Sequence, residues 1–202
     1  YINGYYSLVG GYYGLGEEAS TDILKVNNPT DDYNSFVFGS MPIGTTSNLF
    51  DTWENGHTWQ LSCTRFLENL AKNSSNFSND VLIQAEAQVR FFRAVTCFNL
   101  AKRYGGQYVV YKQLPELGEK NHPLCSPEEG WQFIYDDLKF AADNLPTKEK
   151  VELGRLTSGA AYGMLARAML YAERWKDASD AAAQVMSQDY ELYEDYGKLF
   201  NN

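Results

Sequence analysis

Aromatic and acidic side chains gather in an irregular stretch of the sequence, where they could bind a sugar. Residues 27–50 are rich in Asn, Asp, Ser, Thr, Gly and Pro, which is typical of a long loop. Rings in such a loop can pack on the C–H bonds of a pyranose face while carboxylates bind its hydroxyls. Alternatively, the rings only attach the loop to the core. The candidate ligand-binding residues are Asp31, Asp32, Tyr33, Phe36, Phe38, Phe50 and Trp53.

Residue patterns for catalysis or metal binding do not occur. The two histidines, His57 and His122, are far apart, and there is no C-x-x-C or H-E-x-x-H, so we expect no metal and no other cofactor. No G-x-S-x-G segment offers a nucleophile. Asp136 and Asp137 are adjacent on an expected helix, so they point to different faces and cannot flank one glycosidic bond. The sequence favours a binding protein over an enzyme.

Composition excludes several further classes. The 202 residues carry a net charge of −9, which does not suit a nucleic-acid partner. No apolar run is long enough to span a membrane, and the first residues show neither a signal segment nor a cysteine for lipidation. Three cysteines are too few for a disulfide framework, and Cys63 and Cys97 fall on apolar helix faces.

The elements that must position these residues are helices. A long helix is predicted over 81–104, because apolar residues form two adjoining stripes at helical spacing, as in a helix buried on two sides. Gly105 and Gly106 should end it in the left-handed conformation. The β-prone residues 108–111 should then run extended.

Further helices are predicted over 51–72, 127–145, 155–173 and 175–187. The last two should form a tight antiparallel hairpin that turns near Glu173 and Arg174. Their small residues, with Ala178 and Ala182 on the second helix, follow tetratricopeptide-type spacing. The predicted fold class is therefore all-α: tetratricopeptide-like helix pairs with long irregular loops.

The long helix and its double glycine resemble the SusD/RagB family. The match is the pattern A-E-A-x-x-R-F-x-R-A followed by R-Y-G-G, and the segments F-L-E-N at 66–69 and D-L-x-x-A at 137–141 also resemble family segments. His57 and Thr64 depart from the family pattern, which suggests a divergent member. The residues that carry the main match are Ala85, Glu86, Ala87, Arg90, Phe91, Arg93, Ala94, Arg103, Tyr104, Gly105 and Gly106.

This resemblance implies a function and an organisation. Residues 1–202 are expected to be the N-terminal part of one SusD-like domain, with N-terminal helices and a loop in 1–80 and the helical scaffold in 81–202. The protein would be a non-catalytic lipoprotein of the outer-membrane surface, attached only by an N-terminal lipid anchor outside this chain. It would capture oligosaccharide for a SusC-like TonB-dependent transporter. Two alternatives stay open: a RagB-like peptide-capturing protein, and a tetratricopeptide-type adaptor that binds a protein segment.

Overall fold

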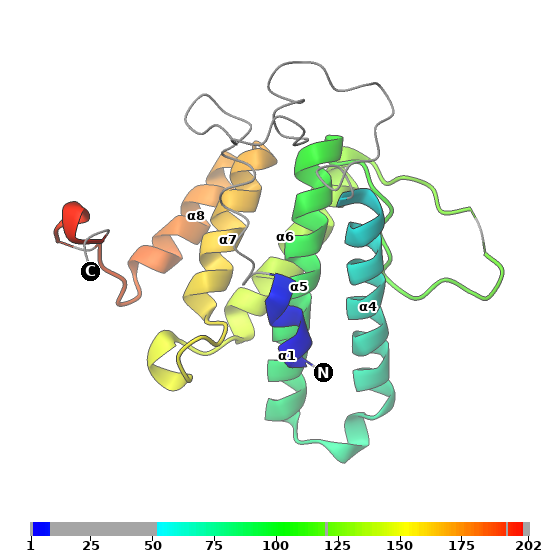
Figure 1. Cartoon of the computed structure of the whole chain (residues 1–202), viewed down its shortest axis with the longest axis horizontal. Helices are drawn as coiled ribbons and strands as arrows, with labels where there is room; N and C mark the ends of the chain where they lie inside the picture. Colours follow the sequence, from blue (N-terminus) through cyan, green and yellow to red (C-terminus); the bar gives the residue numbers. More distant parts are fainter. Residues whose placement is uncertain (1, 9–51, 120, 193, 200–202) are drawn as a thin grey trace, which may run out of the picture.

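The fold is a set of helices packed in chain order (Figure 1). The computed structural model describes residues 2–8, 52–119, 121–192 and 194–199, and that part contains no strand. The predicted all-α class is confirmed, with short 3-10 turns at Tyr6–Leu8, Ser74–Asn76, Lys148–Lys150 and Tyr196–Leu199. The helices are α1 (Ile2–Tyr5), α4 (Thr52–Lys72), α5 (Asn79–Tyr104), α6 (Pro127–Asn144), α7 (Ser158–Tyr171) and α8 (Trp175–Met186).

Helix α5 is the centre of this arrangement. It packs between α4 and α6, and the short α1 lies against it (Figure 1). Both predicted apolar stripes are buried: Val89 and Phe92 on one, Ala94 and Phe98 on the other. A helix covered on two sides needs apolar residues over most of its circumference, which explains the double stripe.

Helix α5 ends and α6 begins where predicted, whereas α7 spans Ser158–Tyr171 and is shorter than the predicted 155–173. Gly105 and Gly106 adopt φ values of 66° and 82°, so α5 ends in the left-handed conformation that glycine tolerates best. At the start of α6, the Ser126 hydroxyl accepts from the Glu129 backbone N–H while the Glu129 carboxylate accepts from the Ser126 backbone N–H. The Glu129 carboxylate also accepts from the Ser126 hydroxyl, and the two hydrogen bonds that it accepts lower the pKa of Glu129. This capping box fixes the direction in which α6 leaves the preceding loop.

Helices α7 and α8 form the predicted antiparallel hairpin, with Glu173 in its turn at a φ of 58°. Ala161 and Ala168 of α7 are fully buried, so the two backbones approach closely. Helix α8 buries Ala178, as predicted, and also Ala181, while the predicted Ala182 beside them is half-buried.

The described helices include none that combines the length and the apolar character needed to cross a bilayer.

Candidate ligand-binding site

The candidate site is built where a polar face of α4 meets the extended segment that follows α5. His57, Gln60, Thr64 and Glu68 recur every three or four residues and so share one face of α4. Gly105 and Gly106 reverse the chain, and residues 107–114 then run along this face. The β-prone residues 108–111 form no strand, and the chain bends at Tyr108. The partner of this segment is a helix.

Side chains of α4 take the place of a neighbouring strand. The backbone N–H groups of Val109 and Leu114 donate to His57 Nε2 at 3.1 Å and to Glu68 Oε1 at 2.7 Å. The Tyr111 N–H donates to Gln60 Oε1, and the Tyr111 carbonyl accepts from the Thr64 hydroxyl at 2.8 Å. Buried backbone groups need partners, so this polar face holds the segment in one register.

The contacts of His57 fix its protonation state. Its Nε2 accepts from the Val109 N–H, and its Nδ1 lies 2.7 Å from the Trp53 carbonyl, which can only accept. The ring is therefore neutral, with its proton on Nδ1. Burial lowers the pKa of His57, which favours the same neutral form.

Five rings form a continuous aromatic row at this junction: Tyr104, Trp53, His57, Tyr111 and His122. The Trp53 ring lies 4.8 Å from Tyr104 and 4.5 Å from His57, measured between ring centroids. Tyr111 continues the row, 6.0 Å from His57 and 5.2 Å from His122. The row joins the start of α4, the end of α5 and the connection to α6.

The row combines a rigid base with an accessible ring. His57 is buried, whereas Trp53 keeps 37% of its surface exposed and Tyr104, Tyr111 and His122 are half-buried. A ring that is braced at its edges and open on one side loses little side-chain entropy when a ligand packs on it. Glu119, whose carboxylate lies 3.8 Å from His122 Nδ1, adds a hydrogen-bond acceptor beside the row.

Of the seven predicted ligand-binding residues, Trp53 is the one that the structure describes, and it lies in the row. The other four residues of the row, Tyr104, His57, Tyr111 and His122, were not among the predicted ligand-binding residues, although Tyr104 stands directly before the double glycine. That position is the signal that could have identified it, because a chain reversal places the last helical residue beside the next segment. The other six predicted residues, outside the described part, are Asp31, Asp32, Tyr33, Phe36, Phe38 and Phe50.

A second polar cluster lies deeper and is structural. Arg93 of α5 donates from Nε and Nη2 to the two carboxylate oxygens of Asp137 at 2.7 and 2.9 Å, and from Nη1 to Thr64 at 3.2 Å. Asp137 is 1% exposed, whereas its neighbour Asp136 is exposed. The predicted separation of these two carboxylates is confirmed, and the buried one faces an arginine instead of a ligand.

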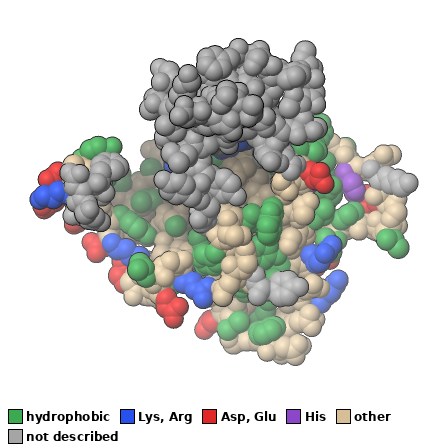
Figure 2. Space-filling view, in the orientation of Figure 1, with side chains coloured by type: hydrophobic (Ala, Val, Ile, Leu, Met, Phe, Trp, Pro, Cys, Tyr) green, Lys and Arg blue, Asp and Glu red, His purple; other side chains and the backbone are tan. Residues whose placement is uncertain are grey.

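Other reactive groups in the described part show no assembled site. The residues placed there form no group of three or more potential metal ligands. All three cysteines are free thiols, and Cys63 and Cys97 are fully buried as predicted. Among the coloured residues in Figure 2, acidic and basic side chains are interspersed, without a continuous basic patch on the face shown.

Comparison with known proteins supports the resemblance seen in the sequence. No protein-family model matches this chain. A curated SusD-like protein of Bacteroides ovatus is 27% identical over 182 residues, covering 79% of this chain. The crystal structure of a SusD-like protein from Bacteroides fragilis superposes with a TM-score of 0.83 at 27% identity over 95% of this chain. A laminarin-binding SusD-like protein shares the fold, with a TM-score of 0.81 at 18% identity over 98% of this chain.

The chain spans only part of these relatives. It covers 33% of the Bacteroides ovatus protein, 37% of the Bacteroides fragilis structure and 46% of the laminarin-binding protein. The central helix, its double glycine and the packing around it indicate a resemblance to SusD-like proteins. The two relatives at 27% identity indicate the same resemblance. In both sequence and fold, this chain is similar to SusD-like proteins.

Proposed function

We propose that this chain belongs to a non-catalytic nutrient-binding protein and that the aromatic row is part of its saccharide site. The observation that carries the proposal is the accessible Trp53 ring, braced by Tyr104 and His57 at the meeting point of three segments. Sugar rings stack on such surfaces, and nearby polar groups orient them. The laminarin-binding relative, which has the same fold, is consistent with a glycan ligand. The proposed site also includes Asp31, Asp32, Tyr33, Phe36, Phe38 and Phe50.

Binding of laminarin-derived and xyloglucan-derived oligosaccharides, measured by isothermal titration, tests the saccharide site. Trp53→Ala should weaken binding at least tenfold, because it removes the stacking surface without opening the core. Trp175→Ala is the matched control: Trp175 is also an exposed tryptophan, but it lies at the start of α8, away from the row. Unchanged affinity in a folded Trp53→Ala protein would exclude this ring from the site.

The same titration separates the two ligand classes. A panel of short neutral peptides replaces the oligosaccharides, and the Trp53→Ala protein is measured with both. Peptide binding that depends on Trp53, without oligosaccharide binding, would replace the saccharide proposal with peptide capture.

We further propose that the protein acts at the outer-membrane surface, where it delivers ligand to a SusC-like TonB-dependent transporter. The SusD-like fold supports this assignment, since the resemblance implies that partner. Affinity purification of the tagged protein from detergent-solubilised outer membranes should recover such a transporter. Recovery of a water-soluble protein in its place would favour the adaptor alternative and would leave the saccharide site to its own test.

A further inference from the structure

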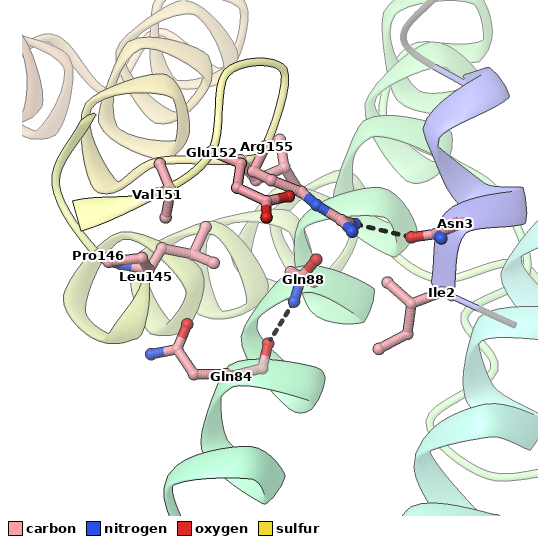
Figure 3. Close-up of a pocket in the computed structure, with 10 residues that line it drawn as sticks. Ile2, Asn3, Gln84, Gln88, Leu145, Pro146, Val151, Glu152 and Arg155 are labelled. Atoms are coloured by element: carbon pink, nitrogen blue, oxygen red, sulfur yellow. Dashed lines mark hydrogen bonds between the residues drawn. The ribbon is translucent and has the colours of Figure 1, made fainter. Parts of the chain in front are cut away.

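A cleft of about 410 Å³ opens between α1, α5 and the connection from α6 to α7 (Figure 3). It lies far from the aromatic row. Gln88 lines the cleft, whereas Tyr104 of the row is 16 residues further along the same helix, about 24 Å at 1.5 Å per residue. The cleft is therefore separate from the aromatic row.

One wall of the cleft is apolar. It is formed where α6 ends and the chain turns toward α7, and Ile2 of α1 adds an apolar group from the opposite side (Figure 3). No aromatic ring is among the lining residues, so this wall suits an aliphatic group better than a sugar face. The apolar residues of the wall are Leu145, Pro146, Val151 and Leu156.

A tight turn places two opposite charges at the mouth of the cleft. The Arg155 N–H donates to the Glu152 carbonyl at 3.1 Å, and Gly154 between them has a φ of 88°. Glycine is the residue that a turn of this kind requires at that position. The turn brings its first and fourth residues together, and Figure 3 shows both side chains directed over the cleft.

The two charged groups keep unused binding capacity. Arg155 Nη1 donates to Asn3 Oδ1 at 2.7 Å, and the guanidinium carbon lies 5.5 Å from the centroid of the Tyr6 ring. These contacts hold the guanidinium over the cleft and leave its other N–H groups available. Among the residues that the structure describes, the Glu152 carboxylate has neither a hydrogen-bond donor nor an ion-pair partner. The Gln88 amide, by contrast, already accepts from the Tyr6 hydroxyl and donates to the Gln84 carbonyl.

This combination selects one class of ligand. Glu152 would oppose an anion alone and Arg155 would oppose a cation alone, whereas a zwitterion can pair with both of these exposed side chains. We propose that the cleft binds a free aliphatic amino acid, with its carboxylate on Arg155, its ammonium on Glu152 and its side chain on the Leu145–Pro146 wall. A guanidinium binds a carboxylate through two parallel N–H donors, which fixes the orientation of the ligand.

Titration with leucine, followed by ¹H–¹⁵N NMR of the 202-residue chain, tests the site. Residues 151–156 and Gln88 should shift saturably, with a Kd on the order of 1 mM or tighter. N-acetyl-leucine lacks the ammonium and leucinamide lacks the carboxylate, so each should bind at least tenfold more weakly. Equal binding of leucine and N-acetyl-leucine would mean a simple anion site and would overturn the proposal.

Charge-removing variants assign the two contacts. Arg155→Gln should weaken leucine binding at least tenfold and leave leucinamide unaffected, whereas Glu152→Gln should weaken leucine and leave N-acetyl-leucine unaffected. Glu149→Gln is the matched control, since Glu149 is an exposed carboxylate of the same connection outside the cleft.

The proposal fails if wild-type protein shows no saturable shift at about ten times the 1 mM scale, or if all three variants behave alike. Trp53→Ala should leave leucine binding unchanged, so this result and that for the saccharide site are independent.

Discussion

Arg93 and Asp137 form a bidentate ion pair that joins α5 to α6 in the interior, with N–O distances of 2.7 and 2.9 Å. The same guanidinium donates to Thr64 of α4, whose hydroxyl in turn donates to the Tyr111 carbonyl. Arg93 thereby connects the scaffold helices to the extended segment that carries part of the aromatic row. The pair links the most buried part of the fold to the candidate site.

Breaking this pair on one side should be strongly destabilising. Asp137→Asn leaves the Arg93 charge buried without a counter-charge, and burial is what raises the pKa of Asp137 against the opposing effect of Arg93. We expect a loss of about 3–5 kcal/mol in the free energy of unfolding, measured by urea denaturation. Asp136→Asn, at the exposed neighbouring position, should change it by less than about 0.5 kcal/mol.

Removing both charges should restore much of that stability. In the double variant Arg93→Met with Asp137→Leu, no unpaired charge remains, so it should be more stable than Asp137→Asn. A double variant as unstable as the single one would show that the hydrogen bond to Thr64, and not the ion pair, dominates the contribution of Arg93.

His57 should make the stability of the fold depend on pH. Because burial lowers its pKa below 6.5, the unfolded chain binds the proton more readily than the folded protein does. The contribution of His57 to the free energy of unfolding is complete above about pH 6.5. It decreases as the pH falls below that value, by at most about 1.4 kcal/mol per pH unit. Denaturation midpoints of wild type and His57→Gln between pH 5 and 8 should differ most at pH 8, and parallel curves would contradict this effect.

Two glycines should respond oppositely to alanine. A Cβ at Gly130 of α6 would lie 2.9 Å from a ring carbon of Tyr108 and closer still to the Gly106 carbonyl oxygen, so Gly130→Ala must displace the chain after α5. At Gly163, on the exposed side of α7, a Cβ meets nothing within 4 Å. Thermal unfolding should show Gly130→Ala losing about 2 kcal/mol or more and Gly163→Ala gaining about 0.5–1 kcal/mol. Equal changes in stability for the two variants would show that helix propensity alone determines the effect of alanine at both positions.

The buried thiols should be protected from modification. Burial raises the pKa of Cys63 to about 12 and raises the pKa of Cys97 as well, so neither forms the reactive thiolate at neutral pH. Native protein treated with iodoacetamide should be alkylated at Cys125 at most, and at all three cysteines in denaturant, as measured by mass spectrometry. Rapid labelling of Cys97 in native protein would show that α4 and α5 separate readily.

The sequence by itself determined the fold class and the order of the helices, with several helix ends misplaced by up to three residues. The double stripe of 81–104 and the double glycine after it are local signals, because spacing and backbone preference act within a few residues. The same residues carried the resemblance that the comparisons support. Trp53 was selected from its type and surroundings, and its position in the aromatic row is consistent with that selection.

Only the tertiary structure decided what these residues contact. The polar side chains of α4 looked like a departure from a family pattern, but they hold the extended segment through its backbone N–H and C=O groups. No sequence pattern indicated that Arg93 pairs with Asp137. None indicated that Glu152 and Arg155 lie together at the mouth of the cleft. Such contacts join residues far apart in the chain or depend on how a turn is placed against α1 and α5. Neither periodicity nor composition encodes them, because both describe the surroundings of a residue along the chain and not across the fold.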